Sequence, residues 1–120
     1  MNYNESLEMY LETIHVLSAK QSNVKSIDVA NELNYARASV SRAIKLLLEK
    51  NYIKLDDKKN IYLTKEGLRI ANEIYDRHKT LTMLFEKIGV SKKTAEDDAC
   101  KIEHVISNET MEAIKKHFAK

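Results

Sequence analysis

The 120-residue chain contains no proline and only two glycines, and this scarcity constrains its fold more than any other feature. The turns of β-sandwiches and β-barrels depend on these two residue types, because proline presets φ and glycine adopts positive φ without strain. A chain so poor in both is better suited to helices that are joined by short polar turns. The sequence therefore predicts a mainly α fold.

Apolar residues recur at helical spacing through the first half of the chain. The pattern predicts a first helix of about four turns that carries Leu7, Leu11 and Ile14 on one face. A short helix capped by Ser26 follows, and a third helix is expected over 37–50. The three residues 34–36 between them begin with an asparagine, which tolerates the left-handed conformation of a tight turn.

The second half begins with two short β-rich segments, 52–55 and 61–63, and the polar residues 56–60 between them are typical of a hairpin tip. Thr64 is then expected to cap a long helix that ends at Gly89. A fifth helix is predicted from about Ser91 to His104 or slightly beyond, and a last helix from Ser107.

Composition excludes several classes of protein. No apolar run approaches the roughly 18–20 residues that a membrane span needs, so an integral membrane protein is not expected. The N-terminal residues lack the pattern of a secretory signal peptide, and a single cysteine fits a reducing compartment, so the expected location is cytoplasmic. The 20 basic and 18 acidic residues leave a net charge of +2, which neither requires nor excludes a nucleic-acid partner.

The order helix, short helix, tight turn, helix and hairpin is that of a winged helix-turn-helix. Residues 37–59 contain seven basic and three acidic side chains, a local excess of +4. Such an excess is often only a solvated surface, but with this element order it favours DNA binding. The candidate DNA contacts on the third helix and the hairpin tip are Arg37, Ser39, Ser41, Arg42, Lys45, Lys58 and Lys59.

A second group of side chains is typical of a metal site. Cys100, Glu103 and His104 stand at i, i+3 and i+4, so a helix would project them to one side, and Glu96 precedes them by one turn. Thiolate, carboxylate and imidazole together suit a divalent transition metal. Further candidates are Met9 and Glu12 on the first helix and His78 on the long helix. Ordinary explanations also exist, since buried cysteine, methionine and histidine are common in helical cores, and Glu12 would ordinarily be a surface carboxylate.

Several segments together resemble one known family. They are Glu8–Ile14, the helix-turn-helix, Leu63–Gly67, Arg77–His78 and Ala99–Ser107, the last of which includes Cys-x-x-Glu-His. In order and over nearly the whole chain, they are similar to the diphtheria-toxin-repressor family of iron- and manganese-responsive transcriptional regulators. The resemblance implies a short, two-domain form: a winged helix-turn-helix DNA-binding domain over 1–63 and a helical metal-binding and dimerisation domain over 64–120.

The resemblance also implies metal ligands. One site of the iron-responsive branch falls on Met9, Cys100, Glu103 and His104, whereas Glu12 matches the manganese branch and His78 matches both. Thr82 and Glu96 stand where the iron branch has a glutamate and a histidine of its second site. A second ion on Glu12, His78, Glu103 and Glu96 is therefore a weaker expectation.

These observations predict a homodimeric repressor that binds a palindromic operator in double-stranded DNA when loaded with Fe(II) or Mn(II), and so regulates metal-ion homeostasis. Zn(II), Co(II) or Ni(II) are expected to act as surrogates. The alternative is a winged-helix regulator without metal in which Cys100 is a redox sensor. An enzyme is not expected, because neither a nucleophile–base pair nor a phosphate-binding glycine loop is present in the sequence.

Overall fold

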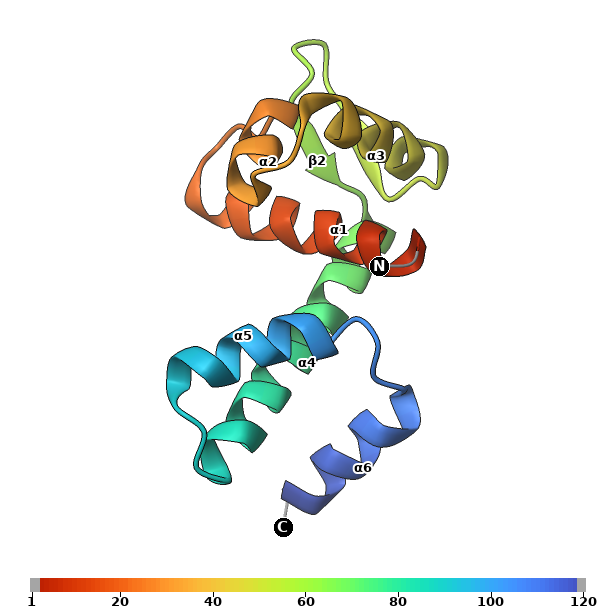
Figure 1. Cartoon of the computed structure of the whole chain (residues 1–120). Helices are drawn as coiled ribbons and strands as arrows, with labels where there is room; N and C mark the ends of the chain where they lie inside the picture. The colour runs from red at the N-terminus through yellow and green to blue at the C-terminus, as the bar shows by residue number, and fades with distance from the viewer. Residues whose placement is uncertain (1–2, 119–120) are drawn as a thin grey trace. The chain divides into compact units, whose positions relative to one another are not determined.

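The structure is a computed structural model that describes the backbone of residues 3–118 and the side chains of residues 7–118. It divides into two compact units, Met1–Asn72 and Glu73–Lys120. The helices are α1 (Tyr3–Lys20), α2 (Ser26–Leu33), α3 (Arg37–Glu49), α4 (Lys65–Lys87), α5 (Lys92–Ile102) and α6 (Asn108–Phe118), and the strands are β1 (Ile53–Leu55) and β2 (Ile61–Leu63). Figure 1 shows the mainly α fold that the sequence predicts.

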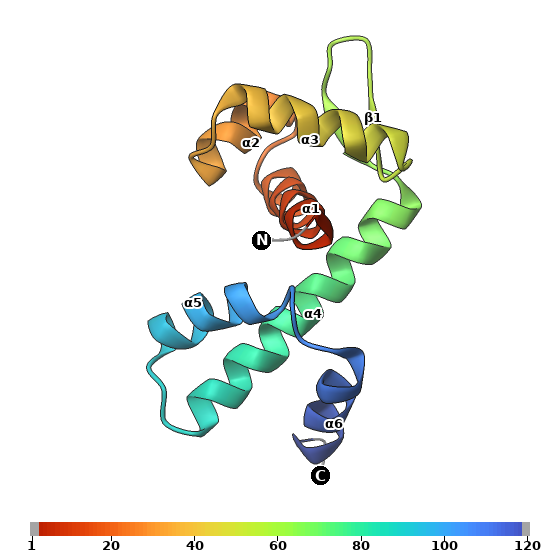
Figure 2. The same cartoon turned by 45° about the vertical axis from the view of Figure 1, so that its right-hand side comes forward.

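The first unit is a winged helix-turn-helix in which α1, α2 and α3 pack around one apolar core (Figures 1 and 2). Leu11, Ile14, Val40 and Leu47 are among its fully buried side chains. The predicted tight turn after α2 is confirmed, because Asn34 has a φ of 58° and its N–H donates to the carbonyl of Ala30. These contacts hold α3 as a rigid element with one face free.

The wing is an antiparallel hairpin of β1 and β2 with the register Ile53 to Leu63 and Leu55 to Ile61. The N–H of Ile61 also donates to the carbonyl of Val24 at 2.7 Å, which ties the hairpin to the loop before α2. The hairpin tip extends beyond α3 in Figure 2. Strand pairing and this extra bond therefore fix the base of the wing and leave its tip exposed.

Two details at the ends of helices differ from the predictions, and one agrees. Ser26 is the first residue of α2, not its cap; the carboxylate of Asp28 instead accepts the N–H of Lys25 at 2.8 Å. Thr64 does cap α4, since its hydroxyl accepts the N–H of Gly67 at 3.1 Å. The fifth helix ends at Ile102 and not at His104 or beyond, so His104 lies in a turn.

The second unit consists of the C-terminal part of α4 together with α5 and α6. Its core contains Leu81, Ala99 and Met111, against which partly buried side chains such as Ile102 and Ile114 pack. Gly89, with a φ of 105°, follows the end of α4, as predicted. None of the helices in the described part of the chain has the length and apolar character needed to cross a membrane.

Candidate DNA interface and metal centre

The third helix separates its side chains into a core face and a free face. Val40, Ala43, Ile44 and Leu47 are buried, which is the apolar stripe expected of an amphipathic helix. The predicted DNA contacts Arg37, Ser41, Arg42 and Lys45 are exposed, and Ser39 is half-buried. This free face carries hydrogen-bond donors of the kind that contact base edges and phosphates.

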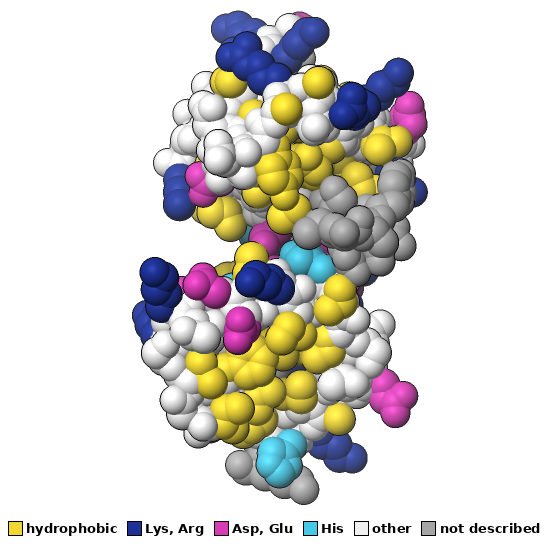
Figure 3. Space-filling model, viewed as in Figure 1, with side chains coloured by type: hydrophobic (Ala, Val, Ile, Leu, Met, Phe, Trp, Pro, Cys, Tyr) yellow, Lys and Arg dark blue, Asp and Glu magenta, His cyan; other side chains and the backbone are white. Residues whose placement is uncertain are grey.

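The hairpin tip carries the other two predicted DNA contacts, Lys58 and Lys59, and both are exposed. The carboxylate of Asp56 organises this tip. One of its oxygens accepts the N–H groups of Lys58 and Asn60, each at 2.9 Å, and the other accepts the Asn60 side-chain amide at 3.0 Å and the Tyr62 hydroxyl at 3.2 Å. These hydrogen bonds, the two from Asn60 foremost, hold the pKa of Asp56 below its ordinary value. Figure 3 shows lysine and arginine side chains gathered on the side of the first unit where the tip and α3 lie.

Two candidate metal ligands belong to α1 in the first unit. Met9 and Glu12 are both half-buried and lie one turn apart. The Met9 sulfur accepts a hydrogen bond from the hydroxyl of Tyr35 at 3.8 Å, and the Tyr35 ring packs edge-on against Tyr10 with 6.1 Å between centroids. Since Tyr35 lies in the turn between α2 and α3, the side chain of Met9 contacts the helix-turn-helix itself.

Three candidate ligands converge in the second unit. The side chain of Glu103 is 0% exposed, and its Oε2 accepts the Nδ1–H of His78, on α4, at 2.8 Å. Its other oxygen, Oε1, lies 3.4 Å from Nε2 of His104, whose side chain is 3% exposed. A buried carboxylate costs much free energy unless it has polar partners; here Oε2 has the hydrogen bond from His78, and Oε1 lies near the imidazole of His104. The arrangement concentrates oxygen and nitrogen donors in one place.

The turn that holds Glu103 and His104 is positioned by Arg77. Its guanidinium donates to the carbonyl of Glu103 at 3.2 Å and to the side chain of Asn108 at 2.9 Å. The N–H of Val105 bonds the carbonyl of Ile102 only three residues back, which tightens the end of α5. The Glu103 carbonyl thus bonds Arg77 at the point where α5 ends, earlier than the apolar periodicity predicts.

These donors suit a divalent transition metal. Carboxylate and imidazole are the ligands that Mn(II), Fe(II) and Zn(II) accept, and a histidine whose Nδ1–H is held by a carboxylate keeps Nε2 as its lone-pair donor. The carboxylate of Glu103 in contact with His78 and near His104 therefore fits such an ion. A bound cation would supply positive charge that offsets the burial of Glu103.

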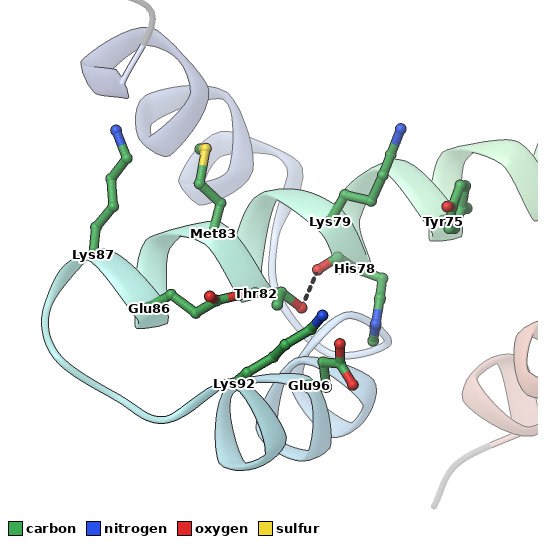
Figure 4. A pocket seen from close by; sticks show the side chains of 9 residues that line it. All are labelled: Tyr75, His78, Lys79, Thr82, Met83, Glu86, Lys87, Lys92 and Glu96. Carbon is green, nitrogen blue, oxygen red and sulfur yellow. Dashed lines mark hydrogen bonds between the residues drawn. The ribbon is translucent and has the colours of Figure 1, made fainter.

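Cys100 and Glu96, the other two candidates on α5, differ in environment from Glu103. The thiol of Cys100 is exposed, although it precedes the buried Glu103 by less than one turn. Glu96 is also exposed, and with His78 it lines an open groove of about 640 Å³ between α4 and α5. Figure 4 shows both side chains in this groove, with Thr82 nearby.

The contacts of three residues of these sites escaped the sequence analysis. Asp56 stands in a polar tip where an aspartate often accepts backbone N–H groups, so its role had a local signal. No local signal indicated the contacts of Tyr35 and Arg77, because their partners Met9 and Glu103 are each 26 residues away in the chain; Arg77 entered the sequence analysis only as part of the family resemblance.

Comparison with known proteins identifies the family of the chain. Residues 2–61 match the family model described as the N-terminal DNA-binding domain of iron-dependent repressors. Residues 64–120 match the model described as the metal-binding and dimerisation domain of the same repressors. The chain belongs to the iron-dependent repressor family. The resemblance to diphtheria-toxin repressors is thereby confirmed, and the chain is one of a family of metal-dependent transcriptional regulators.

Relatives of this repressor-family chain are found among archaea and bacteria. It is 36% identical over 115 residues to an uncharacterized HTH-type transcriptional regulator of Methanocaldococcus jannaschii, with 93% of this chain and 91% of the relative covered. It is 30% identical over 120 residues to the transcriptional regulator MntR of Escherichia coli, with 97% and 77% covered.

Solved structures share the fold of this family member. The crystal structure of T. acidophilum IdeR matches with a TM-score of 0.80 and 26% identity over 94% of this chain and 54% of that one. The manganese regulator SloR has a TM-score of 0.81 at 24% identity, over 99% of this chain and 55% of that one. The chain therefore spans about half the length of these two structures.

Proposed function

We propose that this chain is a homodimeric repressor that binds operator DNA when it is loaded with Fe(II) or Mn(II), and so regulates metal-ion homeostasis. The observation that carries the metal dependence is the buried carboxylate of Glu103, with His78 Nδ1 at 2.8 Å and His104 Nε2 at 3.4 Å from its oxygens. Membership of the iron-dependent repressor family supports the same function.

The proposed ligands combine soft and hard donors. They are Met9, Glu12, His78, Cys100, Glu103 and His104, with Glu96 as a further ligand if a second ion binds. The thioether and the exposed thiol of Cys100 favour Fe(II) over Mn(II), whereas the carboxylates favour Mn(II). Zn(II), Co(II) and Ni(II) should occupy the same donors as surrogates.

The proposed DNA contacts lie in the first unit. Arg37, Ser39, Ser41, Arg42 and Lys45 would face the major groove from α3, and Lys58 and Lys59 would contact phosphates from the wing. In a twofold dimer, the two recognition helices would read half-sites separated by one duplex turn, about 34 Å, which predicts a palindromic operator.

Uncovered apolar side chains in the second unit support the dimer. Met83, Ile88 and Val105 are exposed, Ile88 by 69% and Val105 by 63%. Figure 3 shows apolar side chains gathered over one face of this unit, beside α5 and α6. The family model of this region is described as a dimerisation domain, so a second copy of this chain is the proposed cover.

Metal would control DNA binding because it would bind the DNA-binding state of the dimer more tightly than the other conformational states. A ligand shifts a conformational equilibrium only as far as it prefers one of the states. Met9 belongs to the unit that would bind DNA, and its sulfur contacts Tyr35 of the helix-turn-helix. Use of Met9 as a ligand would therefore link metal occupancy to the helices that contact DNA.

Two measurements test this function. Duplexes selected by the wild-type protein from a random pool in the presence of Mn(II) or Fe(II) would be titrated with and without the metal, and Mn(II) binding would be measured by calorimetry. We expect metal to raise DNA affinity at least tenfold. Glu103→Gln should lower Mn(II) affinity by about a hundredfold or more, because loss of a mere hydrogen-bond partner of a metal ligand already costs about 10- to 100-fold. Glu109→Gln, an exposed carboxylate on α6, is the control and should bind as wild type.

Equal DNA affinity with and without metal would contradict the co-repressor mechanism. The redox alternative makes the opposite prediction: oxidation would release DNA, chelators would have no effect, and Cys100→Ala would abolish the response. His104→Ala should impair metal binding only in the metal-dependent mechanism.

A further inference from the structure

The wing tip is built around one acidic side chain in a region where basic side chains would contact DNA. Asp56 accepts four hydrogen bonds, from the backbone N–H groups of Lys58 and Asn60, the amide of Asn60 and the hydroxyl of Tyr62. Its own N–H and carbonyl bond Asn60 and Lys59 at 3.2 Å and 2.9 Å. Among the described contacts, three of the four tip residues 57–60, all but Asp57, thus have a hydrogen bond to Asp56.

The same turn contains an uncommon backbone conformation at one of the two lysines. Lys59 has a φ of 65°, in the left-handed region that residues other than glycine, asparagine and aspartate rarely adopt. Without the Asp56 carboxylate, only the backbone hydrogen bonds between Asp56 and residues Lys59 and Asn60 would remain to hold Lys59 in that conformation. Lys58 and Lys59 would then sample many directions, and each would lose more conformational entropy on contacting a phosphate.

We propose that Asp56 is a positioning residue for DNA binding: its hydrogen bonds preorganise the wing tip so that Lys58 and Lys59 meet the phosphate backbone. The inference rests on the proposed DNA-binding function. It is distinct from simple charge complementarity, because a carboxylate this close to DNA repels phosphate. Its presence is favourable only if the order that it imposes on the tip outweighs that repulsion.

Loss of the Asp56 charge should strengthen DNA binding, whereas loss of its hydrogen bonds should weaken it, so the sign of the change in affinity separates the two effects. Asp56→Asn and Asp57→Asn each remove one negative charge from the same tip, but only Asp56→Asn weakens the hydrogen bonds that hold it. The asparagine oxygen can still accept the two backbone N–H groups, whereas its NH2 group cannot accept the Asn60 amide or the Tyr62 hydroxyl. Charge alone predicts tighter DNA binding and a steeper salt dependence for both variants. The positioning role predicts that Asp56→Asn binds about three- to tenfold more weakly, whereas Asp57→Asn binds as tightly as wild type or more tightly.

The experiment uses the Mn(II)-loaded full chain and a fluorescent mixed-sequence duplex of roughly three helical turns, titrated at several salt concentrations. Because each fixed lysine–phosphate contact contributes about 0.9 to the slope of log K against log[salt], Asp56→Asn should flatten the slope by up to about 2. A purely structural defect would weaken binding equally in any background. In a Lys58→Gln/Lys59→Gln background, the positioning role predicts no further loss from Asp56→Asn.

Tyr62→Phe is a milder variant that still tests the inference if Asp56→Asn fails to fold. It removes one of the four hydrogen bonds without a change in charge, and it should lower affinity about twofold with a smaller change in slope. If Asp56→Asn binds as tightly as Asp57→Asn, or if its effect persists without the two lysines, the inference is overturned. If the wild-type chain does not bind the duplex at any salt concentration, it is the proposed function that fails.

Discussion

Gly67 stands where the wing meets the first turn of α4, and replacing it with alanine sets two effects against each other. In a helix, alanine is favoured over glycine by about 1 kcal/mol. A Cβ on Gly67, however, would lie 2.0 Å from the carbonyl oxygen of Tyr52 and 2.9 Å from its carbonyl carbon. Both atoms belong to the backbone, so no side-chain rotation relieves the clash.

The size of the effect follows from what must move. The Tyr52 carbonyl would have to retreat by more than 1 Å to reach an ordinary contact distance, and it also accepts the N–H of Thr64 at 3.0 Å. Overpacking of this kind costs about 1–3 kcal/mol, and a lost backbone hydrogen bond costs about 1 kcal/mol. After the gain in helix propensity, we expect Gly67→Ala to destabilise the first unit by about 1–3 kcal/mol.

Native-state amide hydrogen exchange measures this change unit by unit, which suits a chain with two compact units. Exchange in α3 and β2 should accelerate in Gly67→Ala. The control is Asn72→Ala, an exposed position of α4 at which alanine should stabilise by a few tenths of a kcal/mol. Protection in Gly67→Ala equal to or greater than that of wild type would refute the steric argument.

Three further predictions concern the two sites. Arg77→Lys cannot bond the Glu103 carbonyl and Asn108 together, so calorimetry should show Mn(II) affinity about tenfold lower while helix content by circular dichroism is unchanged. Tyr35→Phe removes the hydrogen bond to the Met9 sulfur; we expect a loss of metal affinity of about threefold, and an unchanged affinity would argue against Met9 as a ligand. The pKa of Asp56 is lowered from 3.8, so its hydrogen bonds contribute fully above about that pH and are lost as pH falls through the lower folded value. The NMR amide shifts of Lys58 should then change only below that pH, and a transition above pH 4 would contradict the hydrogen-bond geometry.

Much of the first unit was predictable because its signals are local. The alternation of buried and exposed residues along α3 and the asparagine that ends α2 each depend on neighbours within a few positions. The errors came at helix ends, from the local bond of Asp28 to Lys25 at the start of α2 and from a distant group at the end of α5. Apolar periodicity extends the fifth helix to His104 or beyond, but Arg77, distant in the chain, bonds the carbonyl of Glu103, and the helix ends at Ile102.

The sequence by itself determined the helical class, the winged helix-turn-helix order and the supply of basic and metal-binding side chains. Those features depend on composition and on spacing within a helical turn or a hairpin. Only the tertiary structure decided that His78 bonds Glu103 across 25 residues, that Glu103 is buried while Cys100 is exposed, and that Tyr35 meets Met9. Spacing along a helix specifies a direction around its axis, whereas burial and convergence depend on which other element packs against that side.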